Sequence, residues 1–408
     1  MIAALLLGVA FAGDPAPAGS VHGELSTFFF GTFPGDQDVL GPDGATGAST
    51  VTGRLMMVLD AGPDIRMTAH PALFASTGAA QWFHTGTGTR PPEAVDLSWS
   101  PELDGTLDTG ARMDWLHIRA KTEGLELTLG RQPIGFGTGV FFTPMDLVSP
   151  FGLTTVDTSH RPGVDAVRVD SFFGTGGRLT GVAAYRGDWD LEGMIFLLEG
   201  QMTLGNTDLH GLAGEMHGEP VLGLGVESGV GAVGLHGDAT LTLPEEEDAF
   251  VRAVVGALWR PTEKTTLSTE AYVQTLGATD PDEYLVLALG ERFARGDLQQ
   301  LGRTYLGTSV QQELGPLVHG SVAAFVNLED TSALLSPMVS CSVADNADLL
   351  AGAFIGLGAR SKEVDPMDLV DPVTMQPLPA EEAARHMGVQ SEFGLVAPTF
   401  FLQLKSAF

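Results

Sequence analysis

The stretch RMDWLHIRAKTEGLELTLGR, residues 112–131, decides the class of fold. Its first half alternates between apolar and charged or polar side chains: Leu116, Ile118 and Ala120 take one parity, and His117, Arg119 and Lys121 take the other. A period of two residues is typical of a β-strand that has one apolar face and one polar face. This half therefore predicts a strand with one face in an apolar environment and the other face in an aqueous one.

The second half of the same stretch repeats the alternation, with Glu126 and Thr128 placed between leucines. The pair Glu123-Gly124 separates the two halves and predicts a tight turn. We expect the halves to form an antiparallel hairpin, in which Lys121 lies opposite Glu126 and Arg119 lies opposite Thr128.

Alternation of this kind recurs along the chain in segments on the order of ten residues, separated by Gly, Pro, Asn and Asp. We place 18 strands in this way. A count of 16 is the alternative, because the pattern is weakest over residues 192–243. The expected strands cover residues 20–30, 50–60, 64–76, 112–122, 125–131, 163–171, 177–187, 192–204, 207–217, 220–229, 232–243, 249–260, 264–276, 302–314, 317–328, 334–344, 348–360 and 398–408.

Composition favours a membrane protein without membrane helices. Of 408 residues, 44% are hydrophobic and 18% are charged, and the mean hydropathy is +0.15. Beyond residue 12, no stretch approaches the roughly 18 consecutive apolar residues of a transmembrane helix. A closed barrel can span a membrane instead, because its strands satisfy each other's backbone groups. We therefore predict an all-β fold: one transmembrane antiparallel β-barrel of about 18 strands.

Several functional classes are disfavoured. The formal net charge of −30 argues against a nucleic-acid partner. Cys341 is the only cysteine, so no disulfide can form within the chain. The run Gly135-Phe136-Gly137-Thr138-Gly139 lacks the Lys-Ser/Thr of a phosphate-binding loop, and no histidine adjoins a nucleophile motif. We expect no enzymatic activity, no cofactor and no metal site.

Residues 1–12 have the character of an export signal. Ile2 to Val9 form a short apolar core, and Ala10-Phe11-Ala12 supplies small residues at a peptidase site. Unlike a typical export signal, this segment has no Lys or Arg before its apolar core. The alternative interpretation is a buried N-terminal strand. Cleavage after Ala12 would leave residues 13–408 as the barrel.

The connections between the expected strands come in two lengths, which tend to alternate along the chain. Glu123-Gly124 is an example of a short turn, and residues 132–162 are an example of a long loop. Short periplasmic turns and long outer loops are the organisation of bacterial outer-membrane barrels. Loop 132–162 carries several phenylalanines, which would form a sticky patch if they were left exposed. We expect this loop to fold into the lumen. A cap over the barrel mouth and a contact in a trimer are the alternatives.

A second long loop contains a helical pattern. Leu285, Leu289 and Phe293 recur at helical spacing, which predicts a short amphipathic helix over residues 282–295. The alternative is a further strand from Tyr284 to Leu289.

The final strand ends in Phe408, and Phe400, Leu402 and Leu404 precede it at the same parity. The machinery that assembles outer-membrane barrels recognises a last strand with a terminal aromatic residue and alternating apolar residues upstream. Ser406 departs from that pattern, because a bulky apolar residue is usual at its position. We interpret the four apolar side chains as an assembly signal, which makes the barrel-assembly machinery an expected partner.

Residues 129–166 carry a further pattern. Leu129-Gly130-Arg131-Gln132 ends a strand, Gly135 and Gly137 follow, Thr143-Pro144-Met145-Asp146-Leu147 lies in the loop, and Gly163-Val164-Asp165-Ala166 begins the next strand. This arrangement resembles a broad family of porin-like outer-membrane proteins of Gram-negative bacteria, in which a GRQ…G strand end leads through a loop into a GVDA-R strand. Residues 344–349 and 391–408 are also similar to that family. The resemblance implies a barrel with passive transport.

Alternation also predicts which charged side chains face the lumen, where they would create the field that selects ions. Arg131 has the parity of Leu129 and should face lipid or the rim, unless Gly130 bends the strand. Mutual pairing of these charges in a packed lumen is the alternative. The pore-lining candidates are His117, Arg119, Lys121, Glu126, Arg131, Asp146, Arg168, Asp170, Arg252, Glu270 and Lys405.

The function we expect is a porin-like channel of the outer membrane for passive diffusion of small solutes or ions. The alternative is a barrel that loop 132–162 plugs, acting as a structural or surface-contact protein. A channel for apolar compounds would need apolar rather than charged walls. The expected partners are outer-membrane lipid, lipopolysaccharide and small solutes, and a homotrimer stays open as the assembly state.

Overall fold

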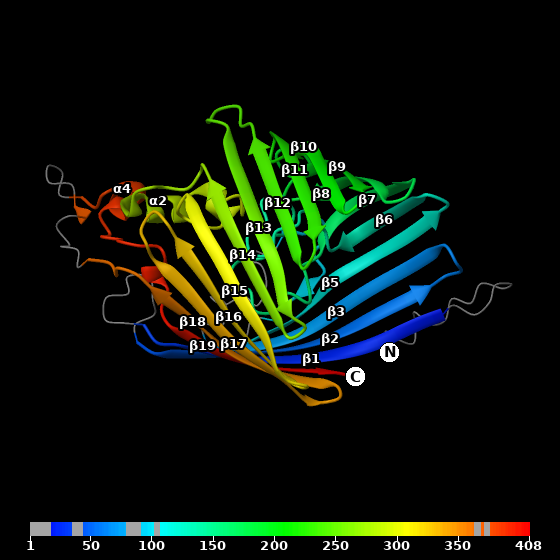
Figure 1. Cartoon of the computed structure of the whole chain (residues 1–408), viewed down its shortest axis with the longest axis horizontal. Helices are drawn as coiled ribbons and strands as arrows, with labels where there is room; N and C mark the ends of the chain where they lie inside the picture. Colours follow the sequence, from blue (N-terminus) through cyan, green and yellow to red (C-terminus); the bar gives the residue numbers. More distant parts are fainter. Residues whose placement is uncertain (1–17, 35–43, 79–90, 102–106, 363–368, 371–375) are drawn as a thin grey trace.

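The computed structural model describes residues 18–34, 44–78, 91–101, 107–362, 369–370 and 376–408, and Figure 1 shows how they are arranged. The expected export signal, residues 1–12, lies outside the described residues. Long tilted strands form the wall of the molecule, and the short helices lie together beyond one end of the strands (Figure 1).

The antiparallel sheet closes on itself. Its first strand, β1 (Ala18–Thr32), pairs with β2 (Thr46–Asp60) along one edge and with β19 (Thr399–Ala407) along the other. The sheet has 19 strands, but the two-residue β4 (Ser98–Trp99) pairs with β5 (Leu107–Thr122) beyond the end of β6, which leaves a ring of 18. The prediction of an 18-stranded barrel is confirmed, and the count of 16 is wrong.

The remaining strands of the ring follow the predicted order, each next to its neighbour in sequence. They are β3 (Ile65–Thr77), β6 (Leu125–Gln132), β7 (Val164–Phe173), β8 (Gly177–Tyr185), β9 (Met194–Leu204), β10 (Thr207–Met216), β11 (Glu219–Val230), β12 (Val233–Thr242), β13 (Phe250–Thr262), β14 (Thr265–Gln274), β15 (Thr304–Gly315), β16 (Val318–Asn327), β17 (Ala333–Ala344) and β18 (Ala347–Leu357).

The two ends of the ring differ. At one end, turns of two to four residues join the strands, for example 61–64, 123–124 and 231–232. Gly124 and Gly231 have φ of 82° and 63°, a conformation that glycine adopts without a steric penalty. The opposite end carries the long connections, including residues 133–163, 275–303 and 358–398. The predicted division into short turns and long loops is therefore present, although the loop at 217–218 is short as well.

The two faces of the wall differ as alternation predicts. On β5, Leu116 and Ile118 are 43% and 46% exposed on the outside, whereas His117 between them is buried. The register of the first hairpin is confirmed, because Lys121 pairs with Glu126 and Arg119 pairs with Thr128. An outer face of exposed leucine, valine and phenylalanine side chains surrounds an inner face that is largely polar.

Among the described residues, two clusters of buried hydrophobic residues lie on the inner side of the wall, near the end with long loops, and a third lies among the helices. One cluster packs Ile134, Phe136 and Met145 of the segment 133–163 against inner side chains of β7 to β11, such as Val182 and Leu197. A second cluster packs Phe142 of the same segment among aromatic side chains of β14, β15, β16, β18, β19 and β1. The contacts of this segment thus reach both sides of the ring.

The predicted helix over residues 282–295 is present but broken. The chain forms a 3₁₀ turn (Pro281–Glu283), α2 (Tyr284–Leu289) and α3 (Glu291–Ala294), with extended backbone at Gly290 between the two helices. Glycine has the lowest helix propensity after proline, which accounts for the break. The alternative of a strand at Tyr284 is wrong. In the described part of the chain, no helix is both long and apolar enough to cross a membrane.

Candidate functional site: the inner face of the barrel

Most predicted pore-lining residues lie on the inner face. These are His117, Arg119 and Lys121 on β5, Glu126 on β6, Arg168 and Asp170 on β7, Arg252 on β13, Glu270 on β14 and Lys405 on β19. Asp146 lies in the segment 133–163 and is buried.

The wall from β2 to β8 is rich in arginine, and its arginines are paired. Arg54 on β2 lies between two carboxylates, with Nη2 2.8 Å from Asp114 Oδ2 and Nη1 3.3 Å from Glu24 Oε1. Arg168 binds Asp170 through two hydrogen bonds of 2.7 and 2.9 Å. These pairs neutralise part of the charge and hold the guanidinium groups in place.

The pairing on β5 and β6 is looser. Arg119 Nε lies 3.5 Å from Glu126 Oε1, and the Arg119 side chain is 39% exposed. Lys121 is exposed at the end with short turns. Among the predicted pore-lining basic residues, these two are the most exposed and therefore the most available to a solute.

The opposite wall, from β9 to β14, presents carboxylates. Glu199 on β9 accepts from Arg178 at 3.4 Å and lies 3.1 Å from His210 Nδ1. Asp238 on β12 and Glu270 on β14 are buried and face the segment 133–163. The inner face thus carries paired arginines on one side and buried carboxylates on the other.

Two of these carboxylates fasten the segment to the wall through its backbone. Asp238 Oδ2 accepts from the N–H groups of Thr138 at 2.6 Å and Gly139 at 3.2 Å. Glu270 accepts from three successive N–H groups, those of residues 140–142, at 2.5 to 3.0 Å. His236 Nε2 lies 2.7 Å from the same Glu270 carboxylate. Hydrogen bonds to a charged acceptor are the stronger kind, so residues 138–142 are firmly held.

An aromatic contact reinforces this attachment. The ring of Phe142 stacks on that of Tyr272 on β14, with centroids 4.7 Å apart and planes within 5°. Phe142 and Phe141 also lie edge-on to Phe325 on β16.

The far part of the segment is fastened to the other side of the ring. Lys405 Nζ on β19 lies 3.2 Å from Asp157 Oδ2 and 2.5 Å from Ser159 Oγ. His160 Nε2 lies 3.2 Å from a carboxylate oxygen of Glu24 on β1. Lys405 is therefore a contact of the segment as well as an inner-face residue.

The base of the segment is closed by an internal ion pair between Arg161 and Asp146. Arg161 Nη1 also donates to the Ser149 carbonyl at 2.6 Å. Burial raises the pKa of the Asp146 carboxyl to about 6, and the neighbouring Arg161 guanidinium offsets only part of that effect.

Arg131 is placed differently from the other candidates. It pairs across from Leu116, on the outward face, yet its side chain is only 3% exposed. Asp165 on β7 and Glu93 supply carboxylates at 2.9 and 2.8 Å, and the Val95 carbonyl accepts at 2.7 Å. Arg131 thus fastens the chain around residues 93–95 to the outside of the barrel and does not join the inner set.

The inner face also contains residues that the sequence reasoning missed. Arg54, Glu24 and Asp238 lie on strands that the alternation predicts. The same alternation assigns their side chains to the inner face. Asp114 could not be found in this way. A bulge on β5 opposite His70 and Pro71 interrupts the alternation, and both Asp114 and Trp115 contact inner-face residues.

The four residues of the expected assembly signal share the outward face. Phe400, Leu402, Leu404 and Phe408 are 39–73% exposed. Within the described residues, no group of three or more His, Cys, Asp and Glu side chains is arranged to hold a metal ion.

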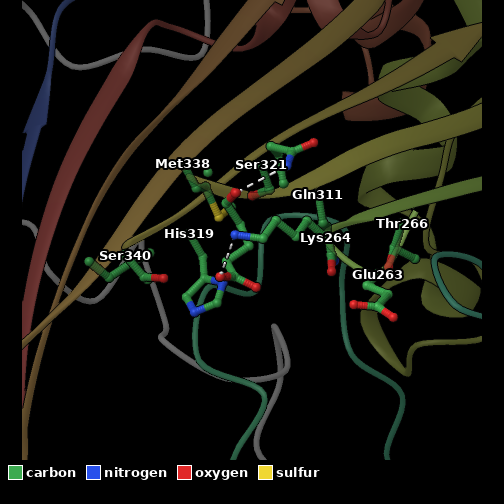
Figure 2. Close-up of a pocket in the computed structure, with 12 residues that line it drawn as sticks. Glu263, Lys264, Thr266, Gln311, His319, Ser321, Met338 and Ser340 are labelled. Carbon is green, nitrogen blue, oxygen red and sulfur yellow. Dashed lines mark hydrogen bonds and ion pairs between the residues drawn. The ribbon is translucent and has the colours of Figure 1, made fainter. Parts of the chain in front are cut away.

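A cavity of about 360 Å³ lies at the end with short turns, beside the β13–β14 and β15–β16 turns (Figure 2). Its walls carry Lys264, Gln311, His319, Ser321 and Met338, whose side chains gather below the strands in Figure 2.

No protein-family model matches the sequence, and no curated protein matches it. Among solved structures, OccAB2 of Acinetobacter baumannii aligns over 96% of this chain and 98% of its own, with a TM-score of 0.57 and 10% identity. OccAB1 of the same organism aligns over 96% of both chains, with a TM-score of 0.55 and 9% identity. At these identities, the likeness shows a shared barrel fold and no more.

Proposed function

We propose that this chain is a porin-like channel of a Gram-negative outer membrane, through which small solutes or ions diffuse passively. The observation that carries the proposal is the contrast between the two faces of a closed ring of 18 strands. The outer face exposes apolar side chains, as contact with lipid requires, while the inner face carries charges. Barrels of 16 to 18 strands are wide enough to leave an aqueous passage.

The segment 133–163 is the natural constriction of this channel. It lies against inner residues on both sides of the ring, through Asp238 and Glu270 on one side and through Lys405 and Glu24 on the other. A segment fastened at both ends narrows a passage without moving in and out of it. We infer a constriction of fixed size rather than a mobile gate.

The charges beside the constriction would act on a passing solute. The inner face carries paired arginines on β2 to β8 and buried carboxylates on β9 to β14, and we infer that these charges together create a field in the lumen. Such a field orients dipolar solutes and discriminates between ions. Arg119 and Lys121, the most exposed of the predicted pore-lining basic residues, would contribute most to ion preference.

The remaining parts of the proposal follow from the barrel. Residues 1–12 would direct export, the outward side chains of β19 would be read by the barrel-assembly machinery, and lipid with lipopolysaccharide would surround the wall. A homotrimer is the assembly state that we propose to test by cross-linking. We propose no enzymatic activity.

The second candidate is a plugged barrel with a structural or surface-contact role. Its supporting observation is the dense packing of the segment 133–163, whose Ile134, Met145 and Val148 are no more than 1% exposed. Such packing could fill the lumen as well as narrow it.

Conductance separates the two candidates. Folded protein inserted into planar bilayers should give discrete current steps if the lumen is open. A matched variant that shortens residues 149–156 removes part of the segment but leaves the Asp238 and Glu270 contacts. If the native protein is silent and only the shortened variant conducts, the barrel is plugged and the channel proposal is wrong.

A further inference from the structure

The inner wall from β14 to β17 has a chemistry of its own. Next to the aromatic contacts of Phe142, on the side of the short turns, four residues that pair across these strands have small side chains. They are Ser268, Ser309, Ala323 and Ser336. The next row towards the short turns holds Thr266, Gln311, Ser321 and Met338, and the row after it holds Glu313, His319 and Ser340. This sector therefore offers hydroxyl and amide groups where the wall opposite offers arginines.

The cavity of about 360 Å³ is built from the second and third of these rows. Figure 2 shows Gln311, Ser321, His319 and Met338 around it, with the β13–β14 turn at its edge. Its volume lies at the lower end of the roughly 300–1,000 Å³ of small-molecule sites. A solute that fits must therefore be small.

The cavity is lined by one lysine, Lys264, and two glutamates, Glu263 and Glu313. Lys264 Nζ lies 3.2 Å from Glu313 Oε1, so its ammonium group has a partner. Both side chains of this pair are partly exposed, at 59% and 32%. Glu263 is exposed on the turn at the edge of the cavity. The one lysine of the lining is paired and two carboxylates stand beside it, which argues against a carboxylate or phosphate ligand.

The uncharged lining has two parts. Gln311, Ser321 and Ser340 provide groups that donate and accept hydrogen bonds. Met338 and Leu350 provide an apolar surface beside them. An apolar solute would displace the water bound to these polar groups without replacing its hydrogen bonds, which costs free energy. A solute with hydroxyl groups along its edges and a C–H face would satisfy both parts.

We propose that this cavity is a binding subsite for a neutral polyhydroxylated solute, of the size of a monosaccharide. The inference rests on the proposed channel function, since the solute would reach the cavity along the lumen. Binding there would be weak, because the cavity is open and the hydroxyl groups must exchange water for ligand.

The test is equilibrium binding of D-glucose to the folded barrel in detergent micelles, measured by saturation-transfer NMR. Gln311→Leu removes the amide at the centre of the lining and should weaken binding about fivefold, the effect of one hydrogen bond. Gln201→Leu is the matched control. It makes the same change on the inner face of β9, outside the cavity, and should leave glucose binding unchanged.

Three results would overturn the subsite: no saturation transfer to glucose, equal binding by the Gln311→Leu variant, or tighter binding of glucosamine or gluconate than of glucose. The last would show that Glu263 or Lys264, rather than the uncharged lining, selects the ligand. Liposome swelling with the same sugars keeps the two proposals apart. Permeation without saturable binding would contradict the subsite proposal and support the channel proposal. Binding without permeation would contradict the channel proposal and support the subsite proposal.

Discussion

At the scale of single residues, the neighbours Ile118 and Arg119 on β5 test the two faces of the wall. Ile118→Arg would place a charge on the outward apolar face, at a cost of roughly 2–4 kcal/mol near the middle of a bilayer. We expect it to reduce the fraction of folded, heat-modifiable barrel. Arg119→Glu should fold normally, because its side chain is 39% exposed on the inner face, and it should shift reversal potentials towards cation preference.

The decisive comparison is which of the two variants folds less well. If Arg119→Glu abolished folding while Ile118→Arg was harmless, the register of β5 would be wrong by one residue. If both variants folded and neither changed conductance, the plugged barrel would be the better description.

Parity predicts side-chain direction only while a strand stays regular, and two residues show where it fails. The bulge on β5 places Asp114 beside Arg54, and no pattern within β5 announces the extra residue. Arg131 lies opposite the outward-facing Leu116 in the register of β5 and β6. What the sequence could not reveal is that residues 93–95 return to cover it, because that contact joins parts of the chain far apart in sequence.

At the scale of elements, the attachment of the segment 133–163 can be loosened at one residue. Glu270 uses both carboxylate oxygens to accept from backbone N–H groups, and a glutamine can offer only one oxygen. Glu270→Gln should therefore cost about 1.5–3 kcal/mol of local stability, the worth of a hydrogen bond to a charged group. We expect faster amide hydrogen exchange at residues 140–142 and noisier open-channel current.

Glu126→Gln is the control for this change. It alters a carboxylate of the inner face that pairs with Arg119 and has no bond to the segment. Equal exchange rates in the native protein and the Glu270→Gln variant would mean that the aromatic contacts alone hold residues 138–142 in place.

Strands were easier to predict than helices and loops, for a physical reason. Each strand shows its two faces in its own sequence, so alternation located all 18 strands of the ring. The helical spacing over residues 282–295 was correct, but one glycine divides it into two short helices. The partners of the long loops depend on contacts across the barrel, which local sequence does not encode.

At the scale of the whole molecule, Phe408 helps to close the ring. The Phe408 N–H donates to the Gly23 carbonyl at 2.9 Å, and the Gly23 N–H donates to the Phe408 carbonyl at 2.7 Å. These bonds join the residue after β19 to β1, and the ring of Phe408 lies over Gly23. Deleting Phe408 removes both bonds and the ring contact, so we expect less folded barrel on heat-modifiability gels. Phe408→Tyr keeps both bonds and an aromatic ring and should assemble normally. Unchanged folding after the deletion would show that β1 and β19 close the ring without this residue.

The pairing of β1 with β19 has a consequence for how the chain acquires its structure. It joins residues near 24 to residues near 407, so the ring cannot close before almost the entire chain has been synthesised. Until then, a partly formed sheet would present two unpaired edges, each able to recruit a strand from another molecule. Contacts so distant in sequence also form slowly. Until β1 and β19 meet, the two sheet edges must therefore stay apart from those of other copies of the chain.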